Sequence, residues 1–175
     1  MNNQTRLCIK RARLPYENLH PAAARRHAGL ADVRTYIQSG NVIAKSDLDS
    51  IGISQLALKS IKQKIGADIT VITRIPEQIK RVLAGNPFPD ADLSRLYYSL
   101  LSASPAPELL QKFLELDFSP DELRVVDDTI YTLYATRLSD SKFTNNFFEK
   151  KLKIASTTRN FNTMTRLVEL SEQKD

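Results

Sequence analysis

Basic and hydroxyl side chains near two predicted helix starts are the residues best suited to chemistry. One helix is expected to begin at Ser141 and another at Asn160 or Asn162. Unpaired backbone N–H groups and the helix dipole favour an anion at such starts. The residues predicted to bind it are Lys142, Thr158, Arg159, Asn160 and Thr163. In the alternative interpretation, the polar side chains only cap the helices and the basic ones are solvated.

A second candidate site is the short run Ser39, Gly40 and Asn41 between two predicted strands. Its backbone and side-chain groups could contact a ligand. A turn that needs Gly40 for its conformation explains the same three residues without any ligand.

The motifs of metal, nucleotide and hydrolase sites are absent from the sequence. His20 and His27 stand seven residues apart with no Cys-x-x-Cys nearby, so we predict no metal site and no cofactor. Cys8 lies among basic residues that could lower the pKa of its thiol, but a small core residue is the plainer interpretation. Paired carboxylates lie at turns or helix starts, where capping explains them. No catalytic residue is identified.

The positive charge of the chain is concentrated towards its two ends. The formal net charge is +5, and residues 1–30 and 142–166 each carry a net +5 of their own, with an acidic middle between them. Such patches attract phosphate-bearing small molecules or nucleic acid. No recognition-helix or RNP-type motif is present, so any nucleic-acid binding should be weak and independent of base sequence. Solvated helix faces are the alternative interpretation.

Composition places the chain among ordinary globular proteins. Its 175 residues are 42% apolar and include one cysteine, which excludes an internal disulfide. No apolar run is long enough for a membrane helix, and no signal peptide is visible, so we expect a cytoplasmic location and no membrane partner. Besides an anion-binding protein, an enzyme acting on a small anionic metabolite and an interaction protein forming a homodimer through its sheet faces remain as alternatives.

The elements that would position these residues follow from periodicity and turn signals. Strands are predicted over 31–38, 42–44, 68–74, 96–101, 122–126, 129–134 and 153–158. Helices are predicted over 48–65, 77–83, 107–116, 141–152 and from Asn160 or Asn162 to Ser171. Within the third helix, the residues expected to face inward are Leu109, Leu110, Phe113, Leu114 and Leu116.

The order of elements in the second half is β-α-β-β-α-β followed by a helix. The first half fits the same order if a strand lies near 6–11 and a helix near 18–28. The predicted fold class is therefore α+β, with two ferredoxin-like halves over residues 1–88 and 89–175. Because the third and fourth strands of such a half run parallel, Lys142 and Arg159 should lie at one end of the second sheet.

Four strings of residues carry a resemblance to a known family. They are Asp32 to Val42, Asn86-Pro87-Phe88, Ser141 to Asn145, and Thr157 to Thr163. In their order and spacing the chain resembles the bacterial domain-of-unknown-function 1697 family over about residues 29–171. The resemblance implies paired ferredoxin-like halves and no established activity.

The N-terminal segment departs from that family. Its members are similar there to an apolar strand followed by a glycine-rich loop, whereas this chain has no glycine before Gly29. Residues 1–28 are therefore predicted to be poorly integrated into the fold, as a reading-frame error or recent divergence would produce. The resemblance therefore does not extend to any function that depends on the glycine loop.

Overall fold

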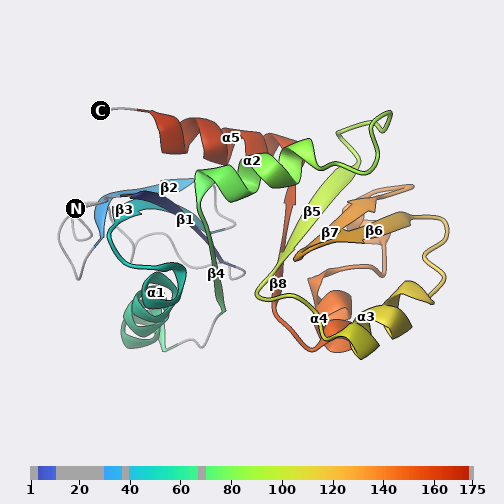
Figure 1. The fold of residues 1–175 in the computed structure, drawn as a ribbon, viewed down its shortest axis with the longest axis horizontal. Coiled ribbons are helices and arrows are strands. Elements are labelled where there is room, and N and C mark those ends of the chain that lie inside the picture. The colour runs from blue at the N-terminus through green and yellow to red at the C-terminus, as the bar shows by residue number, and fades with distance from the viewer. Residues whose placement is uncertain (1–3, 11–29, 37–39, 67–69, 174–175) are drawn as a thin grey trace. The chain divides into compact units, whose positions relative to one another are not determined.

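The computed structural model describes residues 4–10, 30–36, 40–66 and 70–173. They form a mixed α/β fold with two four-stranded antiparallel sheets (Figure 1). The chain divides into two compact units, Met1–Arg81 with Arg166–Asp175, and Val82–Thr165. Within the described ranges, no helix combines the length and apolar character needed to cross a membrane.

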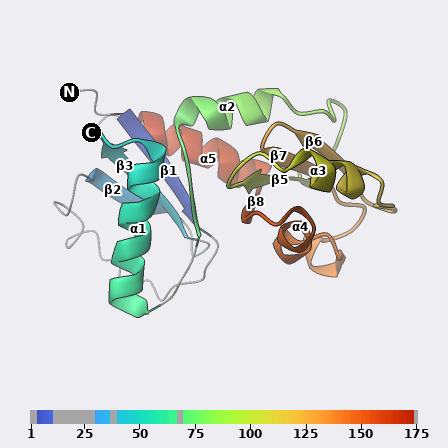
Figure 2. The same cartoon turned by 60° about the horizontal axis from the view of Figure 1, so that its bottom comes forward.

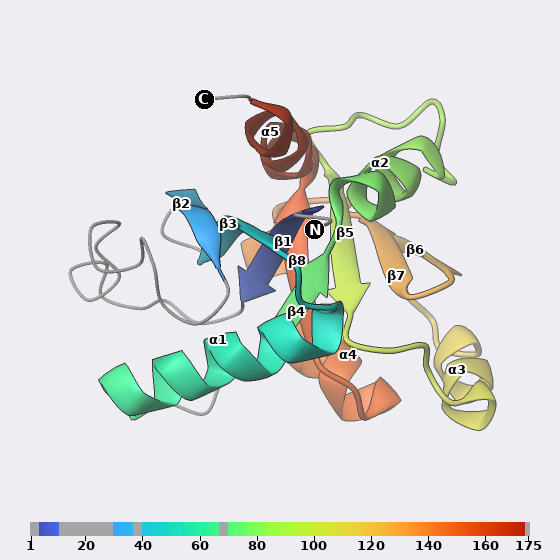
Figure 3. The same ribbon diagram turned by 60° about the vertical axis from the view of Figure 1, so that its left-hand side comes forward.

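The first sheet contains β1 (Gln4–Lys10), β2 (Ala31–Tyr36), β3 (Asn41–Ser46) and β4 (Val71–Arg74), in the order β2-β3-β1-β4. Helix α1 (Ser50–Ile65) lies along one face of it (Figures 2 and 3). The Asp49 side chain caps α1 by accepting from the Gly52 N–H, and Gly66 ends the helix at φ 67°. Helix α2 (Pro76–Ala84) follows β4.

Strand β1 corrects one prediction. It occupies a central position in its sheet, paired with β3 from Gln4 to Ile9 and with β4 from Leu7 to Lys10. The prediction of poor integration is therefore wrong for these residues, because regular backbone pairing on both sides needs no glycine-rich loop after the strand. The helix predicted near 18–28, together with His20 and His27, lies outside the described residues.

The second unit follows the predicted order of elements. It contains β5 (Leu96–Leu101), α3 (Pro107–Leu114), β6 (Glu122–Val126), β7 (Thr129–Leu133), α4 (Asn145–Leu152) and β8 (Ser156–Asn160). The sheet order is β6-β7-β5-β8, and helix α5 (Phe161–Glu172) follows β8. The β6–β7 hairpin turns at Asp127, which has a φ of 52° although it is not a glycine.

Three predicted details of this unit are wrong. Helix α4 begins at Asn145 and not at Ser141, because Ser141 follows a single 3₁₀ turn (Leu138–Asp140). Strand β8 is shifted towards the C-terminus, since Lys153 ends α4 in the left-handed region at φ 59°. On α3, Leu114 is 53% exposed, whereas Phe113 is buried.

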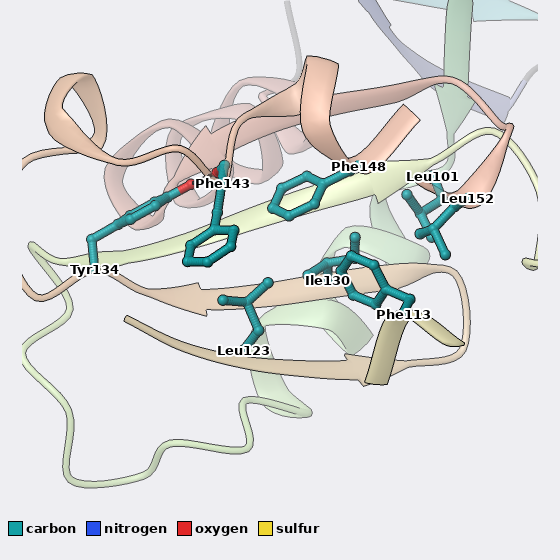
Figure 4. Close-up of a cluster of buried hydrophobic side chains, with 8 residues drawn as sticks. All are labelled: Leu101, Phe113, Leu123, Ile130, Tyr134, Phe143, Phe148 and Leu152. Carbon is teal, nitrogen blue, oxygen red and sulfur yellow. Dashed lines mark hydrogen bonds between the residues drawn. The ribbon is translucent and has the colours of Figure 1, made fainter. Parts of the chain in front are cut away.

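The core of the second unit lies between its sheet and the pair α3 and α4 (Figure 4). Phe113 of α3 and Phe148 of α4 meet at 6.1 Å between ring centroids. The Tyr134 hydroxyl donates to the Phe143 carbonyl at 2.7 Å, which ties the segment before α4 to the end of β7. The buried members of this cluster are Leu101, Phe113, Leu123, Ile130, Tyr134, Phe143, Phe148 and Leu152.

Candidate anion-binding site

The two faces of the second sheet carry different parts of the predicted site. Residues paired across antiparallel strands share a face, and neighbours along a strand lie on opposite faces. Thr158 pairs with Ser99 on the face that α3 and α4 cover. Arg159 pairs with Tyr98, so both side chains lie on the other face. The backbone therefore separates the side chains of Thr158 and Arg159.

Arg159 is buried, with 7% of its surface exposed. Its Nη1 donates to the Thr157 hydroxyl at 2.9 Å and to the Thr158 carbonyl at 2.7 Å. Burial lowers the pKa of the guanidinium to about 10, because desolvation disfavours the charged form. Arg159 is therefore buried and hydrogen-bonded to its own strand. It does not lie in solvent at a helix start.

Tyr98 and Tyr131 lie on the same face of the second sheet as Arg159, on the two neighbouring strands. Tyr98 pairs with both Arg159 and Tyr131, and the two tyrosine rings pack edge to face at 5.6 Å. The Tyr131 hydroxyl donates to the Val82 carbonyl at 2.9 Å. Among the described residues, the Tyr98 hydroxyl has no hydrogen-bond partner although its side chain is fully buried. Burial raises the pKa of each tyrosine to about 12.

Thr158 belongs to a polar network between α4 and β8. Its hydroxyl donates to Asn145 Oδ1 at 2.8 Å and lies 2.6 Å from the Ser99 hydroxyl. Ser156 donates to the same amide oxygen at 2.8 Å, and its N–H donates to Glu149 Oε1 at 2.8 Å. These bonds attach the first turn of α4 to β8. Sequence reasoning missed Asn145 as their acceptor, because the helix was predicted to begin four residues earlier.

The remaining predicted residues are held by local hydrogen bonds or exposed. Asn160 Oδ1 accepts from the Thr163 N–H at 2.9 Å, which is the capping arrangement at the start of α5. Ser141 accepts from the Phe143 N–H at 3.0 Å and donates to buried Asp121 at 2.7 Å. Lys142 is exposed. Anion binding by the predicted set stays a prediction.

Lys142 is one of four exposed lysines in or next to α4. The α4 lysine surface consists of Lys142, Lys150, Lys151 and Lys153. Lys142 Nζ lies 5.0 Å from the Phe143 ring centroid and Lys151 Nζ lies 5.8 Å from that of Phe147. Among residues that the structure describes, none of the four forms an ion pair. This surface is the strongest concentration of accessible positive charge in the second unit.

The described part of the second candidate site has the conformation of a turn. Gly40 has a φ of 82°, a conformation that favours glycine. Asn41 is fully buried, and its Nδ2 donates to the Tyr36 carbonyl at 3.1 Å. Ser39 lies outside the described residues. In the described part of the chain, no three His, Cys, Asp or Glu side chains are grouped so as to hold a metal ion.

Comparisons with known proteins give a fold and a family. The conserved bacterial protein SP0830 from Streptococcus pneumoniae has a similar solved structure, with a TM-score of 0.71 and 15% sequence identity. The similarity covers 98% of this chain and 99% of the other. A search of curated proteins finds no match.

A family pattern matches residues 10–131. The match begins further towards the N-terminus than the resemblance visible in the sequence, and it ends before the Ser141 and Thr157 strings. Because it spans well over half of the chain, the protein belongs to the family described as protein of unknown function, DUF1697.

Proposed function

We propose that this protein binds the phosphate groups of nucleic acid, without base specificity, through the α4 lysine surface. One observation carries the proposal: four exposed lysines lie within twelve residues of chain, and the one carboxylate of α4, Glu149, accepts a hydrogen bond from the Ser156 N–H. The positive charge of the four lysines is therefore available to an external polyanion.

We expect the four lysines of the α4 lysine surface to contribute unequally to phosphate binding. Lys142 lies near Asp117, whose pKa is lowered chiefly by hydrogen bonds from Ser119 and to a smaller extent by the charge of Lys142. Lys150, Lys151 and Lys153 cluster at the other end of α4. Lysines at a helix C-terminus also interact favourably with the helix dipole, and each stabilises the helix by about 0.3–1 kcal/mol. A test of binding therefore has to measure the stability of each variant separately.

The surroundings of the lysines support backbone contacts and not base stacking. Phe143 is 2% exposed, and Phe147 packs edge to face against it at 5.1 Å. Phe143 belongs to the core, and the partly buried Phe147 packs against that core with Lys151 Nζ 5.8 Å from its ring centroid, so neither ring offers an open face to an unpaired base. We therefore expect similar affinity for single strands and duplexes of equal length, apart from their different charge densities.

Binding of a small anion by the residues predicted in the sequence analysis is a separate proposal. The contacts of those residues support it to different degrees. Lys142 is accessible, whereas the groups of Thr158, Asn160 and Thr163 already take part in internal hydrogen bonds. An anion at Arg159 would have to reach a side chain that is 7% exposed. These contacts support the lysine surface over the Arg159 end of the sheet.

We also propose that residues 1–88 and 89–175, which each contain one of the two sheets, are ferredoxin-like halves. The sheet order β6-β7-β5-β8 places the first strand between the third and the fourth, and β2-β3-β1-β4 has the same arrangement. That pattern is typical of a β-α-β-β-α-β unit with its helices on one face.

The test is the salt dependence of binding to labelled oligonucleotides, followed by fluorescence anisotropy. The variant Lys150→Gln/Lys151→Gln should bind more weakly than the wild type at low salt. Its slope of log affinity against log salt should be shallower by about 0.9 for each duplex phosphate that the variant no longer neutralises. The full chain is used throughout.

A matched variant controls for net charge. Lys112→Gln/Arg137→Gln removes the same two charges from exposed positions of the second unit outside the α4 lysine surface. We expect it to keep most of the wild-type slope, and urea unfolding to show that both variants are folded. Equal slopes for the two double variants, or tight binding that survives high salt, would reject the proposal.

A further inference from the structure

One arginine in each of the strands β4, β6 and β8 forms the same hydrogen bond. Its Nη1 donates to the carbonyl of the residue directly before it. The pairs are Arg74 and Thr73 at 2.9 Å, Arg124 and Leu123 at 2.9 Å, and Arg159 and Thr158 at 2.7 Å. In the sheets that the structure describes, each of these strands stands at an end of its sheet. The bond therefore recurs at sheet edges.

In β6 the bonded carbonyl points away from the sheet. The Asp128 carbonyl, immediately before β7, accepts from the Leu101 N–H of β5 at 2.9 Å. Successive residues of an antiparallel strand direct their backbone groups to opposite sides, so the first, third and fifth residues of β7 direct theirs towards β6. They pair with the first, third and fifth residues of β6. The backbone groups of Leu123 and Val125 therefore face the edge.

Of the three strands, only β6 borders solvent along its length. All four residues of β4 are buried, and so are three of the five residues of β8. A buried carbonyl needs a partner because water cannot reach it, and an arginine supplies one in those two strands. In β6 the side chains of Glu122, Arg124 and Val126 are exposed. An exposed edge presents its outward backbone groups to any other strand.

Three contacts hold the guanidinium of Arg124 at this edge. Besides the bond to the Leu123 carbonyl, its Nη2 lies 3.9 Å from a carboxylate oxygen of Glu122. Its Cζ lies 5.4 Å from the ring centroid of Phe88, and that ring is buried and attracts the cation. The guanidinium thus stays beside the outward carbonyl, where the N–H of an added strand would otherwise bind.

The charge of Arg124 acts against the same pairing. Two copies of β6 can pair antiparallel over all five residues only about a two-fold axis beside Arg124, the middle residue. That register places Arg124 directly opposite the partner's Arg124, and like charges so placed are destabilising. The two residues that follow, Val125 and Val126, have high strand propensity, and Val126 is 40% exposed. Without the arginine, the strand is suited to pairing with itself.

We infer that Arg124 closes the β6 edge to a second copy of this chain. Its guanidinium covers the outward Leu123 carbonyl, and its charge repels the equivalent arginine of an approaching copy. The inference concerns association of the protein with itself, so it does not depend on nucleic-acid binding.

The experiment measures self-association of the full chain by sedimentation equilibrium over a range of concentrations. The wild type should keep the mass of one chain. Arg124→Ala should associate, with a dissociation constant at least about tenfold below the lower limit that the wild type sets. Arg137→Ala is the matched control and should behave as the wild type, because Arg137 is exposed and lies outside the strands.

Amide hydrogen exchange locates the contact. In Arg124→Ala, exchange at Leu123 and Val125 should slow as the concentration rises, whereas the Glu122 amide faces β7 and should not change. Urea unfolding shows whether each variant is folded. Arg124→Gln, which keeps an extended side chain without its charge, carries the same expectation if Arg124→Ala is unfolded. The inference is overturned if the wild type associates through these amides, if folded Arg124 variants stay single chains like Arg137→Ala, or if they associate without slower exchange at Leu123 and Val125.

Discussion

Arg159 shows how far one residue's role depends on the strand that carries it. Beside Thr158 and Asn160 it resembles an exposed cation at a helix start, yet it lies in β8 and is 7% exposed. We expect Arg159→Ala to lower the free energy of unfolding by about 1–3 kcal/mol, because the Thr157 hydroxyl and the Thr158 carbonyl lose a charged donor. Urea unfolding measures this change.

Lys142→Ala is the matched comparison for that experiment. Lys142 is exposed, and surface substitutions usually change stability by no more than about 0.5 kcal/mol. Phosphate binding by calorimetry on both variants tests the small-anion prediction at the same time. A stability of Arg159→Ala equal to that of Lys142→Ala would contradict a structural role for the buried arginine.

At the scale of a single element, strand β1 holds the first sheet together. Its residues pair with β3 on one side and β4 on the other, so the backbone N–H groups of β1 are hydrogen-bonded within the sheet. We expect amide hydrogen exchange over residues 4–10 to be as slow as that of β5, which occupies the corresponding place in the second sheet. Exchange at the rate of an exposed loop would show that β1 is not paired in solution.

Helix α4 shows why an element can be predicted while its boundary is missed. The apolar stripe of Phe143, Phe147, Phe148 and Leu152 has helical spacing, which predicts the helix correctly. Phe143 precedes the helix, however, and reaches the same core from a segment that the Ser141–Asp121 and Tyr134–Phe143 hydrogen bonds hold in place. Those bonds join residues that are 20 and 9 positions apart and lie outside the helix, so helical periodicity could not reveal them.

At the scale of the whole molecule, buried tyrosines govern the response to alkaline pH. Burial raises the pKa of Tyr98 and of Tyr131 to about 12, and raises that of Tyr134 as well. Below pH 10 these groups are neutral in both the folded and the unfolded chain. Above it the unfolded chain loses their protons first, so we expect stability to fall progressively from about pH 10 to about pH 12. Urea unfolding across this range checks the prediction.

Two phenylalanine variants make that measurement specific. Tyr98→Phe should weaken the alkaline loss and leave stability near neutral pH unchanged or higher, because no partner among the described residues is deprived of a bond. Tyr131→Phe also removes an ionisable group, but it costs about 1 kcal/mol near neutral pH through the lost bond to Val82. An alkaline profile identical in Tyr98→Phe and the wild type would contradict the assignment.

Local signals in the sequence were sufficient for most elements of the described residues. Asp49 and Gly66 mark the ends of α1, Pro76 opens α2, and the β-branched run before Arg74 forms a strand. Capping, proline geometry and β-propensity act over a few residues, so they can be recognised without the fold. The order of elements and the mixed α/β class followed from the same signals.

Only the tertiary structure decided what surrounds the candidate residues. Which face of the second sheet Arg159 occupies depends on the register of β8 against β5, and Asn145 meets Thr158 because α4 packs back onto that strand. Burial and register arise from contacts between segments far apart in the chain, and a residue's type is compatible with either outcome. The sequence by itself therefore determined the elements and the distribution of charge, while packing determined that Arg159 is inside and that the lysines of α4 are outside.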